Sequence, residues 1–122
     1  MRPSGQHRCV VTGAGRGLGL EFARQLAVRG DFVVGACRSL NSVGDLRAAL
    51  GIEGMVVELD LTDARCRRLR LRSVGRDLDA IDLLINAAGA EDSPASGGPL
   101  AALERDALIS VFTVDVAGLP WW

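Results

Sequence analysis

Hydrophobic positions along the chain follow two alternating patterns. Short runs that are apolar almost throughout occur four times, and such runs predict buried strands. The four runs are residues 9–12, 32–37, 55–59 and 81–86. Between them, apolar positions recur at spacings of three and four, which is typical of amphipathic helices.

The first of these helices contains Leu18, Phe22 and Leu26 at helical spacing, and Gly30 is placed to end it. The later segments extend the pattern. They are a helix from about residue 41 to 50, a helix capped by Thr62 or Asp63 that reaches about residue 78, a Ser-, Gly- and Pro-rich loop at 90–99, and a helix over 100–116. No internal repeat interrupts this order.

Strands that alternate with helices, and that are apolar on both faces, imply βαβ units and a parallel sheet covered on both sides. Right-handed crossovers then favour a doubly wound arrangement. We therefore expect an α/β fold in which residues 1–122 form one domain around a parallel sheet of four strands, the fourth at an open edge. A domain of 122 residues has a thin margin of stability.

Charge and cysteine content narrow the classes of function. Fourteen arginines balance fifteen acidic residues for a formal net charge of −1, so the overall charge draws the chain neither to nucleic acid nor to an anionic membrane. Cys9, Cys37 and Cys66 are odd in number and lack C-x-x-C spacing, which argues against a disulfide framework or a zinc site. With no signal-peptide core and no apolar run near the ~20 residues of a membrane span, we expect a soluble, cytoplasmic protein.

Two residue types are missing from all 122 positions: the chain has no tyrosine and no lysine. A mechanism that needs a phenol or a side-chain amine is therefore excluded for this chain alone. The only other basic side chain besides the arginines is His7, which precedes the first predicted strand without a partner that would suggest catalysis.

The segment that joins the first strand to the first helix carries the clearest chemical signal. It reads Thr-Gly-Ala-Gly-Arg-Gly-Leu-Gly, a T-G-x-x-x-G-x-G pattern. Glycines let the backbone approach a diphosphate closely, and the helix N-terminus offers free N–H groups and a positive dipole end. An ordinary flexible turn is the competing interpretation, which the position between a strand and a helix disfavours. The residues expected to bind phosphate are Thr12, Gly13, Gly15, Arg16, Gly17, Leu18 and Gly19.

The end of the second strand predicts which dinucleotide binds. In nicotinamide-binding folds, an acidic residue about 20 positions past the glycines binds the ribose 2′-hydroxyl and selects NAD(H). This chain has Cys37 and Arg38 there, and no carboxylate. A guanidinium suits a 2′-phosphate, and Arg16 in the glycine loop could reinforce the same charge. We therefore predict NADP(H) over NAD(H); the alternative is that Arg38 lies on a solvated loop.

The third strand ends in Asp60 and Leu61, where the carboxylate can accept a hydrogen bond from an adenine amino group. Asp63 is better explained as a helix cap. Asp60 and Leu61 directly follow the predicted parallel strand 55–59, and the carboxyl ends of such strands border the ligand crevice.

The fourth strand ends in Asn86, Ala87, Ala88 and Gly89. Small residues at this edge leave room for a flat cofactor ring and ribose. Asn86 can also tie neighbouring strand ends together by hydrogen bonds. On its own, the N-A-A-G sequence is only a turn.

Taken together, these motifs resemble the classical short-chain dehydrogenase/reductase family. Residues 12–19 match its T-G-x-x-x-G-x-G motif, Asp60 its adenine-contacting aspartate, and residues 86–89 its N-N-A-G motif with Ala87 in place of the second Asn. The stretches 17–26 and 36–38 look like the subgroup of C-factor and sniffer-like carbonyl reductases. The resemblance covers about residues 8 to 118.

The resemblance implies an NADP(H)-dependent oxidoreductase with a Rossmann-like fold, acting on a small carbonyl or alcohol. In the family a Tyr-x-x-x-Lys pair and a serine assist hydride transfer, since a phenol needs a nearby cation to act near neutral pH. Those residues lie beyond the matched stretch, so we assign no catalytic residue. A further family asparagine aligns with Asp115, which is a departure. Family members usually pair through later helices, so a longer form is expected to be a homo-oligomer.

Two other interpretations stay open. The chain could be a short form that binds a dinucleotide without turnover, as a sensor or a partner of a full-length homologue. It could also be a non-functional product that does not fold stably, because the fourth strand and the last helix lack their covers. The sequence 119–122, Leu-Pro-Trp-Trp, departs from the helical continuation and suggests truncation, a frameshift or an alternative end. The basic run at Arg65, Arg67, Arg68, Arg70 and Arg72 is expected to be a solvated helix face rather than a phosphate or nucleic-acid patch.

Overall fold

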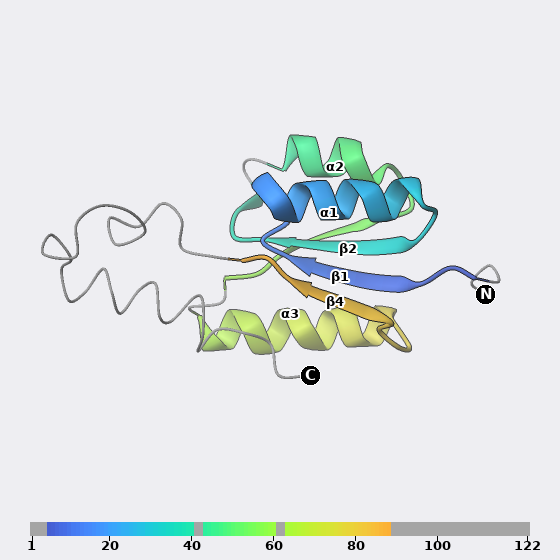
Figure 1. The fold of residues 1–122 in the computed structure, drawn as a ribbon. Coiled ribbons are helices and arrows are strands. Elements are labelled where there is room, and N and C mark those ends of the chain that lie inside the picture. The colour runs from blue at the N-terminus through green and yellow to red at the C-terminus, as the bar shows by residue number, and fades with distance from the viewer. Residues whose placement is uncertain (1–4, 41–42, 61–62, 89–122) are drawn as a thin grey trace, which may run out of the picture.

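The computed structural model describes residues 5–40, 43–60 and 63–88. Within them, strands and helices alternate along the chain as the hydrophobic pattern predicts (Figure 1). The strands are β1 (Arg8–Thr12), β2 (Phe32–Cys37), β3 (Met55–Glu58) and β4 (Leu83–Asn86); the helices are α1 (Gly17–Val28), α2 (Gly44–Leu50) and α3 (Ala64–Asp77). The predicted loop at 90–99, the predicted helix at 100–116 and Asp115 lie outside the described residues.

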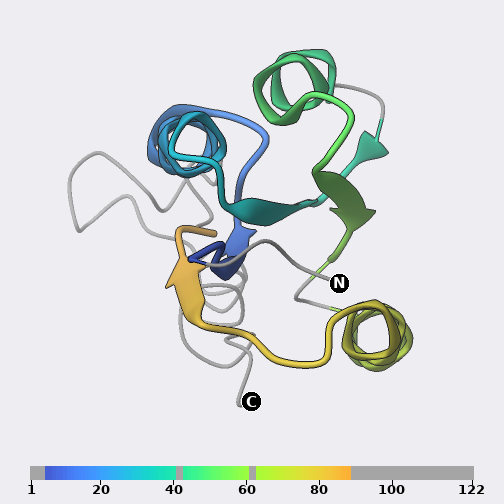
Figure 2. The same cartoon turned by 90° about the vertical axis from the view of Figure 1, so that its right-hand side faces the viewer.

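The four strands form one parallel sheet in the order β3-β2-β1-β4, which confirms the expected doubly wound α/β fold. Cys9 of β1 pairs with Val33 of β2 on one side and with Leu83 of β4 on the other. From β1 to β3 the chain moves in one direction across the sheet, and it then crosses back past β1 to β4. Because crossovers are right-handed, α1 and α2 cover one face and α3 the opposite face (Figure 2).

Two apolar clusters hold these layers together, and strand residues alternate between them. Under α1 and α2 lie the buried side chains of Cys9, Val11, Ala14, Ala23, Leu26, Val33, Cys37, Val43, Leu46 and Leu50. On the α3 side lie those of Val10, Val34, Val74 and Leu78. Burial on both faces explains why the inner strands β1 and β2 are apolar at nearly every position, whereas β3 is half-buried and β4 is exposed at its first and last residues.

Helix α1 buries a different face from the one suggested by its large apolar residues. Leu26 is buried, but Leu18 is 75% exposed and Phe22 43% exposed. Gly19 and Ala23 are the buried partners of Leu26. Small side chains let the helix lie close to the sheet, so the line of Leu18, Phe22 and Leu26 predicted the helix correctly and its packing face only in part.

Some element ends also differ from the expected ranges. β3 ends at Glu58 rather than Leu59, and β4 begins at Leu83 rather than Ile81. Before β4, Asp82 already bonds to Arg8 twice: its N–H donates to the Arg8 carbonyl at 2.9 Å, and its Oδ2 accepts from the Arg8 N–H at 2.8 Å. A side-chain bond therefore takes the place of ladder pairing at the start of the strand.

At the amino ends of the strands, a buried carboxylate fastens the turn between α1 and β2 to the start of β1. Asp31 has only 3% of its side chain exposed. Its Oδ1 accepts from the His7 N–H at 3.0 Å, and its Oδ2 accepts from Arg29 Nε at 2.5 Å. Burial alone would raise the pKa of Asp31, but the hydrogen bonds from His7 and Arg29 outweigh it and hold that pKa below its ordinary value.

None of the helices in the described ranges is both long enough and apolar enough to cross a membrane.

Candidate functional site

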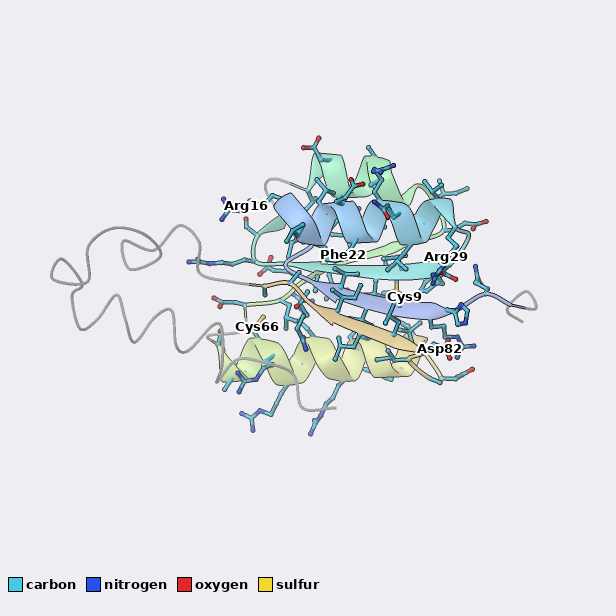
Figure 3. All side chains as sticks on the ribbon, in the orientation of Figure 1. Cys9, Arg16, Phe22, Arg29, Cys66 and Asp82 are labelled. Carbon is cyan, nitrogen blue, oxygen red and sulfur yellow. The ribbon has the colours of Figure 1, made fainter. Side chains whose placement is uncertain are left out.

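The loop at residues 12–16 and the start of α1 lie at the carboxyl ends of the strands, where β1 separates β2 from β4. At this edge the chain leaves β1 toward one neighbour and returns from the other side of the sheet, which makes it the topological switch point of the fold. Figure 3 shows Arg16 at this edge and Asp82 at the opposite one. Open α/β sheets bind ligands at this point.

The glycine loop is held closely against the end of β4. Gly13 has a positive φ of 63°, and a Cβ placed on it would lie 2.5 Å from the Ala88 nitrogen and 2.6 Å from the Ala87 carbonyl oxygen. A Cβ on Gly19 would overlap the Gly13 carbonyl oxygen. Both contacts are with backbone atoms, so no side chain could be accommodated at Gly13 or Gly19 without moving the chain.

Gly17 differs from these two glycines, because a Cβ placed on it would meet no atom of the described residues within 4 Å. Its φ of 58° still favours glycine. Helix α1 starts here with no side-chain cap at Arg16 and no acidic residue in its first turn. Within the described residues, the first N–H groups of the helix therefore have no cap from the Arg16 side chain, and no acidic residue in the first turn neutralises the positive dipole end. This arrangement fits a bound anion.

Thr12 ties the carboxyl ends of β1 and β4 together. It pairs with Asn86 in the sheet register and is 1% exposed. Its hydroxyl donates to the Ile85 carbonyl at 3.5 Å and accepts from the Ala88 N–H at 3.4 Å. The tie between strand ends that the sequence suggested for Asn86 is made by Thr12 in the described part of the chain, and Asn86 is exposed.

The floor beneath the loop is small and apolar. Ala36 and Leu59 are buried together, with Ala88 packed against them. The Ala14 N–H donates to the Ala36 carbonyl at 3.0 Å and fixes the loop over β2. Ala88 belongs to the N-A-A-G motif and Ala14 to the glycine loop, but Ala36 and Leu59 were not among the predicted site residues. The only sequence signal for Ala36 was its small size at a strand end.

Cys37, at the end of β2, lies under the loop, 3.4 Å from where a Gly15 Cβ would be. Burial, and then the Glu58 carboxylate, raise the pKa of the Cys37 thiol. The thiol therefore stays neutral near neutral pH, and it packs as a small apolar group.

The remaining predicted residues lie around this floor. Arg38 follows β2 with an exposed side chain, Arg16 is exposed in the loop, and Asp60 is half-buried after β3. Leu61 and Gly89 fall outside the described residues. Asp63 is the α3 cap, as expected: its Oδ1 accepts from the Arg65 N–H at 2.9 Å and the Cys66 N–H at 3.1 Å.

Comparison with known proteins agrees with this geometry. A family model described as short chain dehydrogenase matches residues 7–121. The 3-oxoacyl-[acyl-carrier-protein] reductase FabG of Haemophilus influenzae is 35% identical over 80 residues, which are 66% of this chain and 33% of that protein. Galactitol 2-dehydrogenase of Agrobacterium fabrum is 29% identical over 109 residues, 89% of this chain and 41% of that protein. This chain belongs to the short-chain dehydrogenase family.

Solved structures give the same result. A short-chain dehydrogenase from Streptomyces avermitilis superposes with a TM-score of 0.82 at 26% identity, over 96% of this chain and 41% of that one. The carbonyl reductase Sniffer of Caenorhabditis elegans superposes with a TM-score of 0.80 at 25% identity, over 93% of this chain and 48% of that one. The chain thus spans between a third and about two fifths of the curated relatives it matches.

Proposed function

We propose that this single domain is the cofactor-binding portion of an NADP(H)-dependent oxidoreductase that interconverts carbonyls and alcohols, of the C-factor and sniffer-like carbonyl reductase subgroup. The observation that carries the proposal is the contrast among the glycines. Side chains are excluded at Gly13 and Gly19 by backbone contact. A Cβ on Gly17 would instead meet none of the described residues, at a helix N-terminus that has no side-chain cap. A loop whose backbone packs closely on the sheet, with room beside the helix N-terminus, fits a diphosphate.

The described residues fit the parts of a dinucleotide in order across the sheet. The loop from Gly13 to Gly19 would hold the diphosphate, and Asp60 after β3 would accept from the adenine amino group. Ala87 and Ala88, at the end of β4, would leave space for the nicotinamide ribose. When bound, the cofactor supplies hydride; the contribution of these residues is to hold and orient it.

The choice of NADP(H) rests on the charge at the end of β2. The described residues that follow this strand, 38–40, are Arg-Ser-Leu, so no carboxylate faces a ribose 2′-oxygen there. Arg38 and Arg16 are both exposed at the same edge of the sheet. An actinorhodin polyketide ketoreductase whose structure was solved with NADPH superposes with a TM-score of 0.81 at 26% identity, which supports the same choice.

Turnover is a separate matter, because these 122 residues contain neither tyrosine nor lysine. A phenol held in its reactive state by an ammonium group is therefore not available among them for proton transfer to a carbonyl. This favours a second candidate function, binding of the dinucleotide without reaction. The free thiols of Cys9, Cys37 and Cys66 suit a reducing compartment, and we propose the cytoplasm as the location.

The test is a pair of titrations of the full chain, with NADPH and with NADH, followed by nicotinamide fluorescence. We expect NADPH to bind about tenfold or more tightly, and Arg38→Asp to remove or reverse that preference. Arg47→Asp is the control, because Arg47 is exposed on α2 and lies outside the loop. Equal affinities in the unaltered chain, or a preference that survives Arg38→Asp, would reject the role of Arg38. Failure of both dinucleotides to bind would reject the site itself.

A further inference from the structure

The outer side of α3 carries a continuous row of cations around one exposed leucine. Arg65, Arg68, Arg72 and Arg76 follow one another at spacings of three, four and four, so they lie on the same side of the helix. All four are exposed. They lie opposite Val74 and Leu78, which are buried against the sheet. Together with Leu69, the four arginines are called the arginine face below.

This concentration of charge is unusual for the chain. Six of its fourteen arginines lie between residues 65 and 76, and no acidic residue lies between Asp63 and Asp77. The pairs Arg68–Arg72 and Arg72–Arg76 are like charges four residues apart, which destabilise a helix. Arg65 lies in the first turn, where the helix dipole disfavours a cation. An external anion bound along the helix would relieve both effects.

Leu69 indicates what kind of anion fits. Its side chain is 54% exposed, and the spacing places it between Arg65, Arg72 and Arg76. A phosphodiester backbone offers nothing apolar for this leucine, and the helix has no aromatic residue to stack on a base. A membrane surface would need a broader apolar face than one leucine. An apolar centre with a charged rim is the arrangement found at protein interfaces.

We propose that the arginine face docks an acidic protein surface, in which carboxylates at helical spacing surround an apolar side chain that packs against Leu69. About 16 Å separates Arg65 from Arg76 along the axis, the length of roughly three helical turns, so one acidic helix could span it. The proposal does not depend on the cofactor site. In Figure 3, nitrogen-tipped side chains project from α3 away from the sheet, whereas Arg16 marks the loop on the other side of the sheet.

The experiment measures fluorescence anisotropy of a labelled helical peptide that carries four glutamates around one central leucine, titrated with the full chain. We expect saturable binding that weakens with salt. The double variant R68E/R72E should weaken it by about tenfold or more, and Leu69→Ser by several fold. Arg47→Glu, an exposed charge reversal on α2, should leave it within about twofold. Circular dichroism of each variant verifies that α3 is folded.

Three results would overturn the proposal. The first is no binding of the peptide at low salt. The second is binding that R68E/R72E and Arg47→Glu weaken equally, or that does not change when serine replaces the leucine of the peptide. The third is tighter binding of a duplex DNA of equal charge, or of vesicles containing phosphatidylserine, than of the peptide. Because the arginine face lies apart from the glycine loop, R68E/R72E should leave NADPH affinity unchanged, which separates this test from that of the cofactor site.

Discussion

Single atoms decide the shape of the glycine loop, and Gly13 is the position where this is most severe. A methyl group there would overlap the Ala88 nitrogen and the Ala87 carbonyl, and the positive φ adds strain. We predict that Gly13→Ala weakens NADPH binding by about a hundredfold or more, because the loop must move away from β4. The measurement is the same fluorescence titration.

Gly44→Ala is the matched control for this prediction. Gly44 is the first residue of α2, and a Cβ there meets no atom within 4 Å in the part of the chain that the structure describes. Its NADPH affinity should equal that of the unaltered chain. Unchanged affinity in Gly13→Ala would show that the loop does not depend on its contact with β4.

Asp31 gives a second prediction at this scale, because its pKa is held below the ordinary value of 3.8. A carboxylate with a lowered folded-state pKa stabilises the fold above its unfolded pKa and loses that contribution as the pH falls through the folded value. We therefore expect Asp31→Asn to cost about 1–3 kcal/mol at pH 7 and less at pH 3. Urea unfolding at the two pH values measures the difference.

Glu21→Gln serves as the comparison. A hydrogen bond from Arg24, then one from Gln25, lower the pKa of Glu21 to about 2, but the pair is exposed to water. Surface pairs of this kind contribute little to stability, so this variant should unfold like the unaltered chain at both pH values. A cost for Asp31→Asn that is equal at pH 7 and pH 3 would contradict the role assigned to its charge.

Among the elements, α3 contains a glycine that the fold does not require. Gly75 lies exposed inside the helix, and among the described residues a Cβ placed on it would meet no atom within 4 Å. Since glycine costs helix interiors conformational entropy, Gly75→Ala should raise the free energy of unfolding by about 0.5–1 kcal/mol. Chemical denaturation measures this. A decrease would mean that the methyl group meets an atom outside the described residues.

The elements also show what the sequence can and cannot predict. The strands were recognisable because burial on both faces leaves apolar runs with little ambiguity. The face of α1 that packs on the sheet could not be predicted in the same way, because Leu18 and Phe22 are far more hydrophobic than Gly19 and Ala23. Close packing against the sheet nevertheless buries the two small residues. Likewise the glycine loop was recognisable by its composition, but the tie made by Thr12 depends on β4 lying beside β1, which no local pattern encodes.

For the whole molecule, ligand binding should be visible as stability. A ligand that binds only the folded state adds about 2.7 kcal/mol at a concentration one hundred times its Kd, on the order of 10 °C in a domain of this size. We expect NADPH to raise the unfolding temperature by that amount, and the shift to disappear in Gly13→Ala. Differential scanning fluorimetry measures it.

The same sample, given NADPH and a reactive aldehyde, should show no loss of nicotinamide absorbance. The reason is the absence of tyrosine and lysine from the 122 residues. Measurable turnover would mean that another acid supplies the proton. A thermal shift without turnover would favour dinucleotide binding as the function of this chain, and no cooperative transition at all would favour an unstable product.

The position of β1 between β2 and β4 also has a consequence for how the protein is made. The Arg8 N–H bonds to the Asp82 carboxylate, so β1 can pair with its second neighbour only after 74 further residues have been synthesised. At ribosomal rates of about 5–20 residues per second, that interval lasts roughly 4–15 s. During it the nascent sheet exposes the edge of its future central strand, which can pair with other chains. The glycine loop acquires its contact with Ala87 and Ala88 only at the end of that interval, so a nascent chain is at risk of misassembly before any cofactor can protect it.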